Sequence, residues 1–391
     1  MKFFLSMFAV TTLVALPQVR DRATPPASNG TVGESDVATL ARGWTAAAAG
    51  QSENAARAAD AVLSRRPWDR AALTLKIEAL SEVAALRGLD AYEQWVAAGH
   101  KDDAALLEPV PIAVLQETAK ETDRTHRVTA LTALVTARVS GARESLDKEL
   151  AVHQQSQGAF LADADAARAG DQAALGRLSA AAGNPVGASV DLVRALEQIG
   201  AAGESGLLML ANAPNPQVRA AAIRALGAMK SERALPILQS LFEGMDPATR
   251  VPATIALAQQ GDPRALARVD QMLASNVPQV QLEAAEAWGG RPGPWVDVIR
   301  PLLENMDGFT RLDAARAIAP VDPDAAKRTL NLAIGDINPA IRYESAKTIE
   351  TLLDSHVAAV DVPVLRQRLR DPDRGVRVAV ASALLKVARL N

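Results

Sequence analysis

Apolar positions recur with helical spacing along most of the chain after residue 35. A clear example begins at Asn215-Pro216, where small or apolar residues fall two, six, nine and ten positions after the proline. These positions share one face of an α-helix. The Asn side chain can cap the free N–H groups of the first turn, and proline is tolerated there because it has no N–H to satisfy. The pattern therefore predicts an amphipathic helix that starts at residue 216 and buries one face.

The same pattern recurs along the C-terminal half of the chain. Further copies begin at Asp246, Val277, Asp307, Asn338 and Asp373. The position three after the proline, or after Gly308 and Arg374 in the two copies that lack it, is Arg219, Arg250, Gln281, Arg311, Arg342 and Arg377 in turn, at spacings of 31, 31, 30, 31 and 35 residues. A second helical stretch separates successive copies, and a fixed period of this length is the signature of a stacked repeat. The sequence therefore predicts an all-α fold, a right-handed α-solenoid of stacked helical hairpins.

The arginines of this column lie near the same end of every predicted helix. Each can reach the Asp or Asn of an adjacent turn, so we expect them to form a structural ladder along the stack. The ladder residues are Arg219, Arg250, Arg311, Arg342 and Arg377. Alanine columns on the same helices would let neighbouring helices approach closely. Both features indicate helix packing.

The segment from Asp373 to Leu384 matches a D-x-x-V-R-x-x-A-x-x-A-L core almost completely. This core is similar to the short HEAT-like repeats of phycobilisome-lyase-type proteins, and the resemblance covers roughly residues 120–391. It implies a HEAT-like repeat solenoid, which we place at residues 109–391. Such a resemblance specifies architecture far more than function.

Residues 36–108 follow a different pattern. Gly50, Ala59 and Pro67 resemble parts of one tetratricopeptide repeat, which ends its second helix with proline before the next helix begins. We therefore expect a tetratricopeptide-like helical region here, with a generic helical hairpin as the alternative. Pro109 marks the predicted junction with the solenoid.

The first residues have the pattern of an export signal. Lys2 precedes an apolar run from Phe3 to Leu16, which is too short for an ordinary membrane span. We predict a signal peptide over residues 1–22 and a disordered linker over residues 23–35. The protein is then exported, either periplasmic or secreted. An uncleaved anchor is the alternative, and no membrane insertion is expected beyond this leader.

Composition narrows the classes of function. Hydrophobic residues make up 49% of the chain but aromatic residues only 3%, which suits closely packed helices. The net charge of −3 is spread without a basic stripe, so no nucleic-acid partner is expected. The chain has no cysteine, which rules out disulfides, thiolate catalysis and cysteine-based zinc sites.

The sequence shows no constellation typical of catalysis or metal binding. The histidines His100, His126, His153 and His356 are not paired at ligand spacing. The run Asp354-Ser355-His356 contains the residue types of a catalytic triad, but sequence neighbours cannot converge on one reacting atom. The glycine-rich stretch 289–294 lacks the Lys-Ser or Lys-Thr of a phosphate loop. We therefore expect no enzyme activity, no cofactor and no metal.

Binding is expected on the concave side of the solenoid, lined by the helices that carry the arginine column. The predicted partner-binding residues are Glu283, Glu286, Asp313, Arg316, Glu344 and Lys347. These charges also stand at i, i+3 spacing, so mutual salt bridges on a solvated face are the competing interpretation. Because the end repeats of a solenoid have an unpaired flank shaped by capping, the terminal repeats should bind less strongly.

The sequence thus favours an exported, non-catalytic scaffold or adaptor that binds protein partners and is itself a monomer. Two alternatives stay open. One is an enzyme or enzyme-accessory subunit, suggested only by the lyase-type repeat resemblance. The other is a structural subunit of an envelope assembly.

Overall fold

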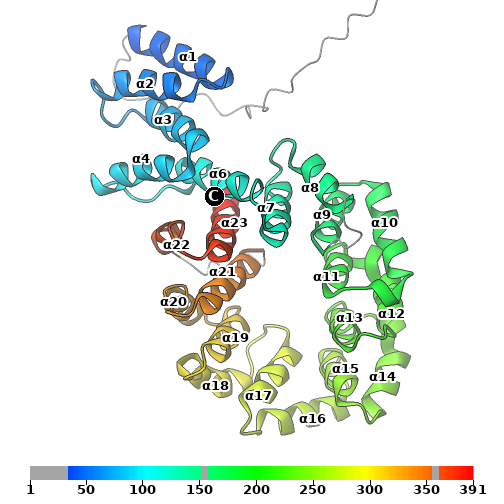
Figure 1. Ribbon diagram of the computed structural model, residues 1–391. Helices are drawn as coiled ribbons and strands as arrows, with labels where there is room; N and C mark the ends of the chain where they lie inside the picture. The colour runs from blue at the N-terminus through cyan, green and yellow to red at the C-terminus, as the bar shows by residue number, and fades with distance from the viewer. Residues whose placement is uncertain (1–33, 152–156, 355–360, 391) are drawn as a thin grey trace, which may run out of the picture. The chain divides into compact units, whose positions relative to one another are not determined.

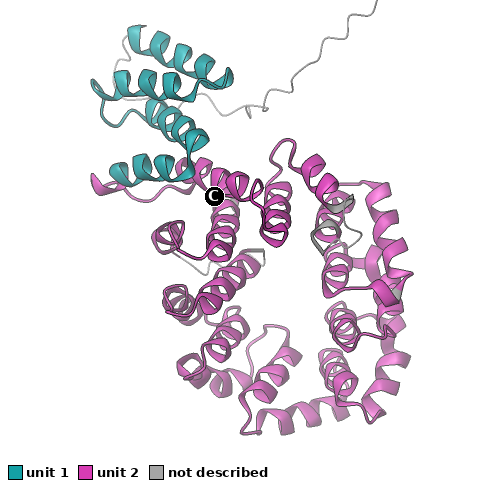
Figure 2. Ribbon diagram, in the orientation of Figure 1, with its two compact units in different colours: residues 1–95 teal, residues 96–391 magenta. Residues whose placement is uncertain are grey.

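The computed structural model describes residues 34–151, 157–354 and 361–390. Every regular element within these ranges is a helix, which confirms the predicted all-α solenoid (Figure 1). The predicted signal peptide and nearly all of the predicted linker lie outside the described residues. The chain divides into two compact units, residues 1–95 and residues 96–391 (Figure 2).

Unit 1 is built from α1 (Glu34–Ala48), α2 (Ser52–Leu63), α3 (Arg70–Val83) and most of α4 (Ala85–Ala97). A small core lies among the first three helices, where Ala55, Ala59 and Leu75 are fully buried. Asp69 caps α3 by accepting a hydrogen bond from the N–H of Ala72. The tetratricopeptide resemblance of this helical region stays a prediction.

Unit 2 contains two layers of helices. The layer that we call the inner helices comprises α7 (Arg124–Thr136), α9 (Gln157–Arg168), α11 (Val190–Gln198), α13 (Pro216–Ala228), α15 (Pro247–Gln259), α17 (Pro278–Ala285), α19 (Gly308–Ile318), α21 (Pro339–Asp354) and α23 (Arg374–Leu390). The second layer and the start of the array comprise α5 (Ala104–Leu107), α6 (Pro109–Thr118), α8 (Ala142–Ala151), α10 (Gln172–Ala182), α12 (Glu204–Leu210), α14 (Leu235–Glu243), α16 (Pro263–Leu273), α18 (Trp295–Ile299), α20 (Pro323–Ala333) and α22 (Val362–Arg368). Short 3-10 helices are η1 (Pro185–Gly187), η2 (Gly200–Gly203), η3 (Glu232–Ala234), η4 (Glu286–Trp288) and η5 (Arg300–Glu304). Each inner helix packs against the next, from α7 to α23, as a stacked repeat requires.

The inner helices begin where the Asn-Pro and Asp-Pro pattern predicts. The side chains of Asn215, Asp246 and Asp307 each accept a hydrogen bond from a backbone N–H in the first helical turn. Val277 stands at the same place before α17 and makes no side-chain cap. A polar N-cap stabilises a helix by about 1 kcal/mol, so the residues that start most repeats also stabilise them.

The core of the repeat array is made largely of alanine and leucine between the two layers. One continuous apolar cluster runs from Ala164 in α9 to Ala314 in α19. Trp295 belongs to this cluster, is 1% exposed and donates from Nε1 to the carbonyl of Arg291 at 3.0 Å. This tryptophan therefore packs in the core and satisfies its polar atom there.

The close approach of α13 and α15 gives a test of this packing. A Cβ built on Gly227 in α13 would lie 2.5 Å from Cα of Ala256 in α15, so the two helices would have to move apart. We expect Gly227→Ala to lower the free energy of unfolding by about 1–3 kcal/mol, despite the better helix propensity of alanine. Gly176→Ala in α10 is the control, because no atom lies within 4 Å of its Cβ position.

The control should raise the free energy of unfolding by about 0.5–1 kcal/mol, since only helix propensity changes. Urea denaturation followed by circular dichroism measures both variants. Effects of the same sign at Gly227 and Gly176 would contradict the close approach of α13 and α15.

The last inner helix closes unit 2 on its first helices. α23 packs against α21 and α22, and also against α5, α6 and α7. Arg374 in α23 contacts Glu121, which follows α6, at 2.8 Å. Arg366 in α22 contacts Asp102 at 3.1 Å. Unit 2 is therefore a closed ring of helices (Figure 1), and not a solenoid with two open ends.

The expectation of an unpaired flank at the C-terminal repeat is consequently wrong. α23 is apolar around nearly its whole circumference, and eight of its apolar side chains are no more than 2% exposed. These are Val376, Val378, Ala379, Val380, Ala381, Ala383, Leu384 and Leu385. The terminal helix of an open solenoid would keep a polar outer face. The uncharged positions of this repeat reflect burial on both sides, and not capping.

Candidate binding site on the inner helices

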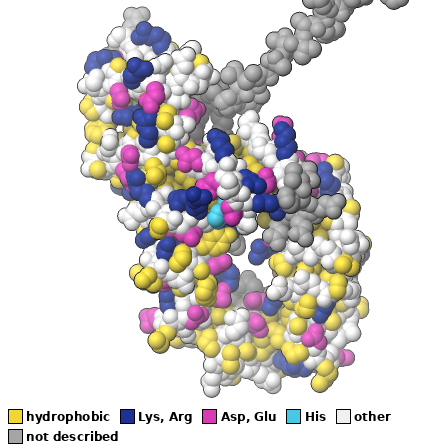
Figure 3. All heavy atoms as spheres, viewed as in Figure 1, with side chains coloured by type: hydrophobic (Ala, Val, Ile, Leu, Met, Phe, Trp, Pro, Cys, Tyr) yellow, Lys and Arg dark blue, Asp and Glu magenta, His cyan; other side chains and the backbone are white. Residues whose placement is uncertain are grey.

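The ring of unit 2 encloses a hollow, and charged side chains border this hollow (Figure 3). Arg224 of α13 donates from Nε to Glu286 of η4 at 2.9 Å, although 62 residues separate them in sequence. The pair passes over α15, whose Gln259 donates to the backbone carbonyl of Glu286 at 2.7 Å. A side-chain contact that skips one inner helix requires a strongly concave surface. These side chains therefore lie on the inside of the ring.

Two carboxylates on this side are exposed and yet have raised pKa values. Desolvation by the surrounding protein raises the pKa of Glu286, and the charge and hydrogen bond of Arg224 offset this only in part. Desolvation likewise raises the pKa of Glu197 in α11, opposed by the charge of Arg194. Both carboxylates nonetheless belong to solvent-exposed residues. Groups that water reaches but protein largely surrounds are suited to electrostatic recognition, because their interactions are screened less than on an open surface.

A second charged cluster joins α21 to α23. Glu350 contacts Lys347 at 2.5 Å and Lys386 at 3.4 Å, and it accepts a hydrogen bond from Ser382 at 2.7 Å. Burial alone would raise the pKa of Glu350, but the two lysines and Ser382 outweigh it and lower this pKa. Desolvation would lower the pKa of Lys347, and Glu350 outweighs that effect and raises it. Glu350 and Lys347 are therefore both charged at neutral pH.

Charged residues that are distant in sequence act on one another across the hollow of the ring. The positive charge of Arg194 in α11 acts on Lys347 in α21 and opposes part of the rise in its pKa. The charge of Arg316 in α19 acts on Glu286 and, like that of Arg224, opposes part of the rise in its pKa. The inner wall thus presents both signs of charge to one space. We call the residues involved the inner charge network: Arg194, Glu197, Arg224, Glu286, Arg316, Lys347, Glu350 and Lys386.

Four of the predicted partner-binding residues lie together on neighbouring helices. Glu283 in α17 and Glu286 in η4 are close enough for the charge of Glu283 to raise the pKa of Glu286. Asp313 and Arg316 form an i, i+3 ion pair within α19. Arg316 also acts on Glu286, so three of these charges share one environment.

The other two predicted residues are placed differently on α21. Lys347 pairs with Glu350 and not with Glu344, which is exposed. Sequence reasoning missed Arg194, Glu197, Glu350 and Lys386 as members of the site. A signal for Glu350 was present, because it stands three residues after Lys347 and continues the same helical face.

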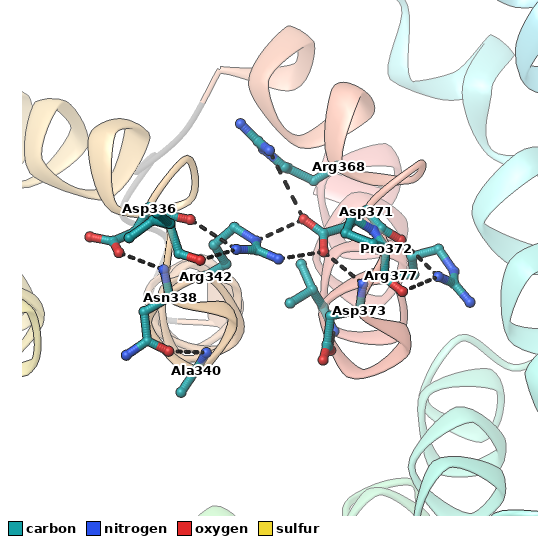
Figure 4. Close-up of polar contacts among 11 residues, drawn as sticks. Asp336, Asn338, Ala340, Arg342, Arg368, Asp371, Pro372, Asp373 and Arg377 are labelled. Atoms are coloured by element: carbon teal, nitrogen blue, oxygen red, sulfur yellow. Dashed lines mark hydrogen bonds and ion pairs between the residues drawn. The ribbon is translucent and has the colours of Figure 1, made fainter.

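The arginine column makes a regular set of hydrogen bonds, drawn for two rungs in Figure 4. Arg342 donates from Nη1 to the backbone carbonyls of Asp336 and Ile337 at 2.9 and 3.0 Å. Equivalent pairs of bonds are made by Arg219, Arg311 and Arg377. The acceptors lie in the turn that precedes each inner helix. Each arginine therefore stabilises the turn that precedes its own helix.

These arginines also reach the next repeat. Arg342 donates to both carboxylate oxygens of Asp371 at 2.8 Å, and the side chains are 9% and 0% exposed (Figure 4). Burial would raise the pKa of Asp371, but the hydrogen bonds and charge of Arg342 outweigh it and lower this pKa. Longer contacts join Arg311 to Asp336 at 3.4 Å and Arg219 to Asp246 at 3.8 Å.

Arg250 occupies the ladder position in α15 but makes neither kind of contact with the residues that the structure describes. Its Nε is buried without a hydrogen-bond partner. The following repeat starts with Val277 where most repeats have Asp or Asn. The ladder is therefore interrupted at this repeat.

A family model described as HEAT repeats matches residues 204–289, the segment from α12 to just beyond η4. This match and the all-helical structure of the described ranges support a HEAT-like repeat protein. No curated protein matches the chain.

Two solved structures are similar to this chain. Human deoxyhypusine hydroxylase in complex with glycerol is 17% identical with a TM-score of 0.32, and the match covers 56% of this chain and 96% of that one. An engineered protein is 19% identical with a TM-score of 0.26, and the match covers 90% of this chain and 98% of that one. At these TM-scores neither likeness carries an argument about function.

Two features are absent from the described ranges. No helix there is long and apolar enough to cross a bilayer. No group of three or more His, Asp or Glu side chains in those ranges is arranged to hold a metal ion. His153 and His356 lie outside the described residues.

Proposed function

We propose that unit 2 is a non-catalytic, protein-binding ring within an exported scaffold or adaptor. Its partner is a segment of another protein that lies against the inner charge network. The observation that carries this proposal is the ion pair between Arg224 of α13 and Glu286 of η4, which spans α15 at an N–O distance of 2.9 Å. Such a contact supports a concave inner surface lined by charged side chains. Export rests on the apolar run from Phe3 to Leu16, with residues 1–22 as the signal peptide.

Two features of the inner charge network favour a polypeptide over a small molecule. The network extends from α11 to α23, whereas a small-molecule site is a compact pocket lined mainly by apolar groups. It also carries both signs of charge, which fixes the register and orientation of a partner more than it adds affinity. The expected partner is therefore an extended segment that carries acidic and basic side chains of its own.

The test reverses three acidic residues that lie beside members of the inner charge network. Glu283 acts on Glu286, Asp313 pairs with Arg316, and Glu344 stands three residues before Lys347. The triple variant carries Glu283→Lys, Asp313→Lys and Glu344→Lys. A protein captured by the parent chain from a cell-envelope fraction would be titrated against the parent and the triple variant at low salt. We expect the variant to bind at least about tenfold more weakly, because like charges brought together at a recognition surface cost several kcal/mol.

The control reverses three exposed acidic residues outside the inner helices, in η3, η5 and α20: Glu232→Lys, Glu304→Lys and Asp324→Lys. It changes the net charge by the same amount, and circular dichroism establishes that both variants are folded. We expect the control to bind within about twofold of the parent, as surface charges away from an interface do. Unchanged affinity of the inner variant, or equal losses in both variants, would rule out the inner surface as the binding site.

A further inference from the structure

The ring of unit 2 has one joint whose two sides are far apart in sequence. We call it the seam: α22 and α23 form one side, and α5, α6 and α7 with their connecting segments form the other. At every other joint between successive inner helices the polypeptide itself spans the gap. Opening the seam requires only the loss of noncovalent contacts, whereas opening another joint must also extend or unfold the chain.

Charge is segregated across the seam. Three arginines on the C-terminal side face three carboxylates on the N-terminal side. The pairs are Arg366 with Asp102 at 3.1 Å, Arg374 with Glu121 at 2.8 Å and Arg389 with Glu108 at 3.9 Å. The side chains of Arg374 and Glu121 are 54% and 22% exposed, so added salt can screen their attraction, whereas the pairs made by Arg366 and Arg389 are largely buried. This joint therefore combines a missing covalent link with one ion pair that salt can weaken.

We infer that the seam is an electrostatic latch, which opens reversibly and admits a protein segment sideways into the ring. The inference rests on the proposed function, in which a partner segment lies along the inner charge network. A segment with folded domains on both sides cannot be threaded end-first through a closed ring. It must pass through a joint that opens, and the seam is the joint with the least covalent constraint.

The experiment measures the seam through the distance between two spin labels. The chain has no cysteine, so Thr122→Cys and Pro372→Cys give a unique pair of labels beside the Arg374–Glu121 ion pair. Both positions are exposed. We expect a dominant short distance at low salt, and a longer-distance population that grows as salt rises from about 0.05 M to about 0.5 M. Glu121→Gln should raise the open-to-closed ratio by about two- to fivefold, the factor that corresponds to one partly exposed ion pair.

The matched control places labels at Ser205→Cys and Glu232→Cys, beside the Arg233–Glu204 ion pair. That pair also has an N–O distance of 2.8 Å, with side chains 59% and 21% exposed, but it joins neighbouring repeats of the chain. We expect the distance between the two control labels to respond neither to salt nor to Glu204→Gln. A single short distance at the seam under every condition, or the same response at both pairs, would overturn the latch. Since no partner is present, this result is independent of the binding test on the inner surface.

Discussion

Replacing Arg342 with alanine is expected to lower the free energy of unfolding by about 3–5 kcal/mol, the cost of breaking a buried ion pair by removing one partner. The side chain of Asp371 is 0% exposed and would keep only the backbone N–H of Asp373 and an Arg368 contact at 4.0 Å. The substitution also removes the donor to two backbone carbonyls in the turn before α21. Chemical denaturation would measure the loss, and hydrogen exchange would locate it in α21 and α23.

Arg250→Ala is the matched control for this prediction. It removes the same side chain from the same repeat position, but Arg250 makes none of the ladder contacts with described residues. We expect the free energy of unfolding to change by less than about 1 kcal/mol. Equal losses in the two variants would show that the contacts of Arg342 contribute nothing beyond what any arginine in this column provides.

The effect of Arg342→Ala should depend on pH with a definite sign. The pKa of Asp371 is lowered in the folded protein, while in the unfolded chain it takes its ordinary value of about 4. A carboxyl group of this kind stabilises the fold above its unfolded pKa, and the contribution is lost as pH falls through the folded pKa. The difference in stability between the parent and the variant should therefore be largest near neutral pH and shrink in acid.

The positions of the ladder could be predicted from the sequence, but its acceptors could not. The column follows directly from the repeat period, whereas the main acceptors are backbone carbonyls that no side chain marks. A signal for the carboxylate acceptors was present. Asp336 and Asp371 each stand three residues before the first residue of an inner helix, and they receive Arg311 and Arg342 from the preceding repeat. At the same place before α17 the chain has Ser275, which offers Arg250 no carboxylate.

The closure of the ring could not be predicted from the repeat pattern. Each repeat contributes a small rotation, and whether the two ends meet depends on the sum of these rotations, which no single period encodes. The contacts that close the ring, such as that between Glu121 and Arg374, join residues 253 apart in sequence. The one local hint was the composition of α23, because an open solenoid does not end on a helix that is apolar on both sides.

Only part of the candidate site could be predicted, again because the repeat period does not encode the curvature of the ring. The strongest copies of the repeat contain the predicted binding residues, which lie on α17, η4, α19 and α21. The copy that contains α11 is degenerate, so Arg194 and Glu197 carried no periodic signal. Their position opposite α21 follows from the curvature of the ring, which becomes visible only when distant charges such as those of Arg194 and Lys347 act on each other.

Leu385→Ala is expected to have the other large effect on stability. Arg374 and Arg389 in α23 both reach the α5–α7 side of the seam, so the helical face that they share points there. Leu385 lies on this face, eleven residues after Arg374, and is 2% exposed. Truncating a buried leucine to alanine lowers the free energy of unfolding by about 2–5 kcal/mol. Leu332→Ala in α20 is the control, because its side chain is 79% exposed and should matter by less than about 0.5 kcal/mol.

The location of the effect distinguishes a closed ring from an open solenoid. In an open array, damage at the last helix would spread only to the repeats next to it in sequence, because each repeat contacts its neighbours alone. In the closed ring, α6 and α7 lose part of their packing as well, since α23 covers them. Hydrogen exchange should therefore become faster in α6 and α7 as well as in α21 and α22. If α6 and α7 keep the protection of the parent while α21 and α22 lose theirs, α23 does not hold the two ends of the ring together.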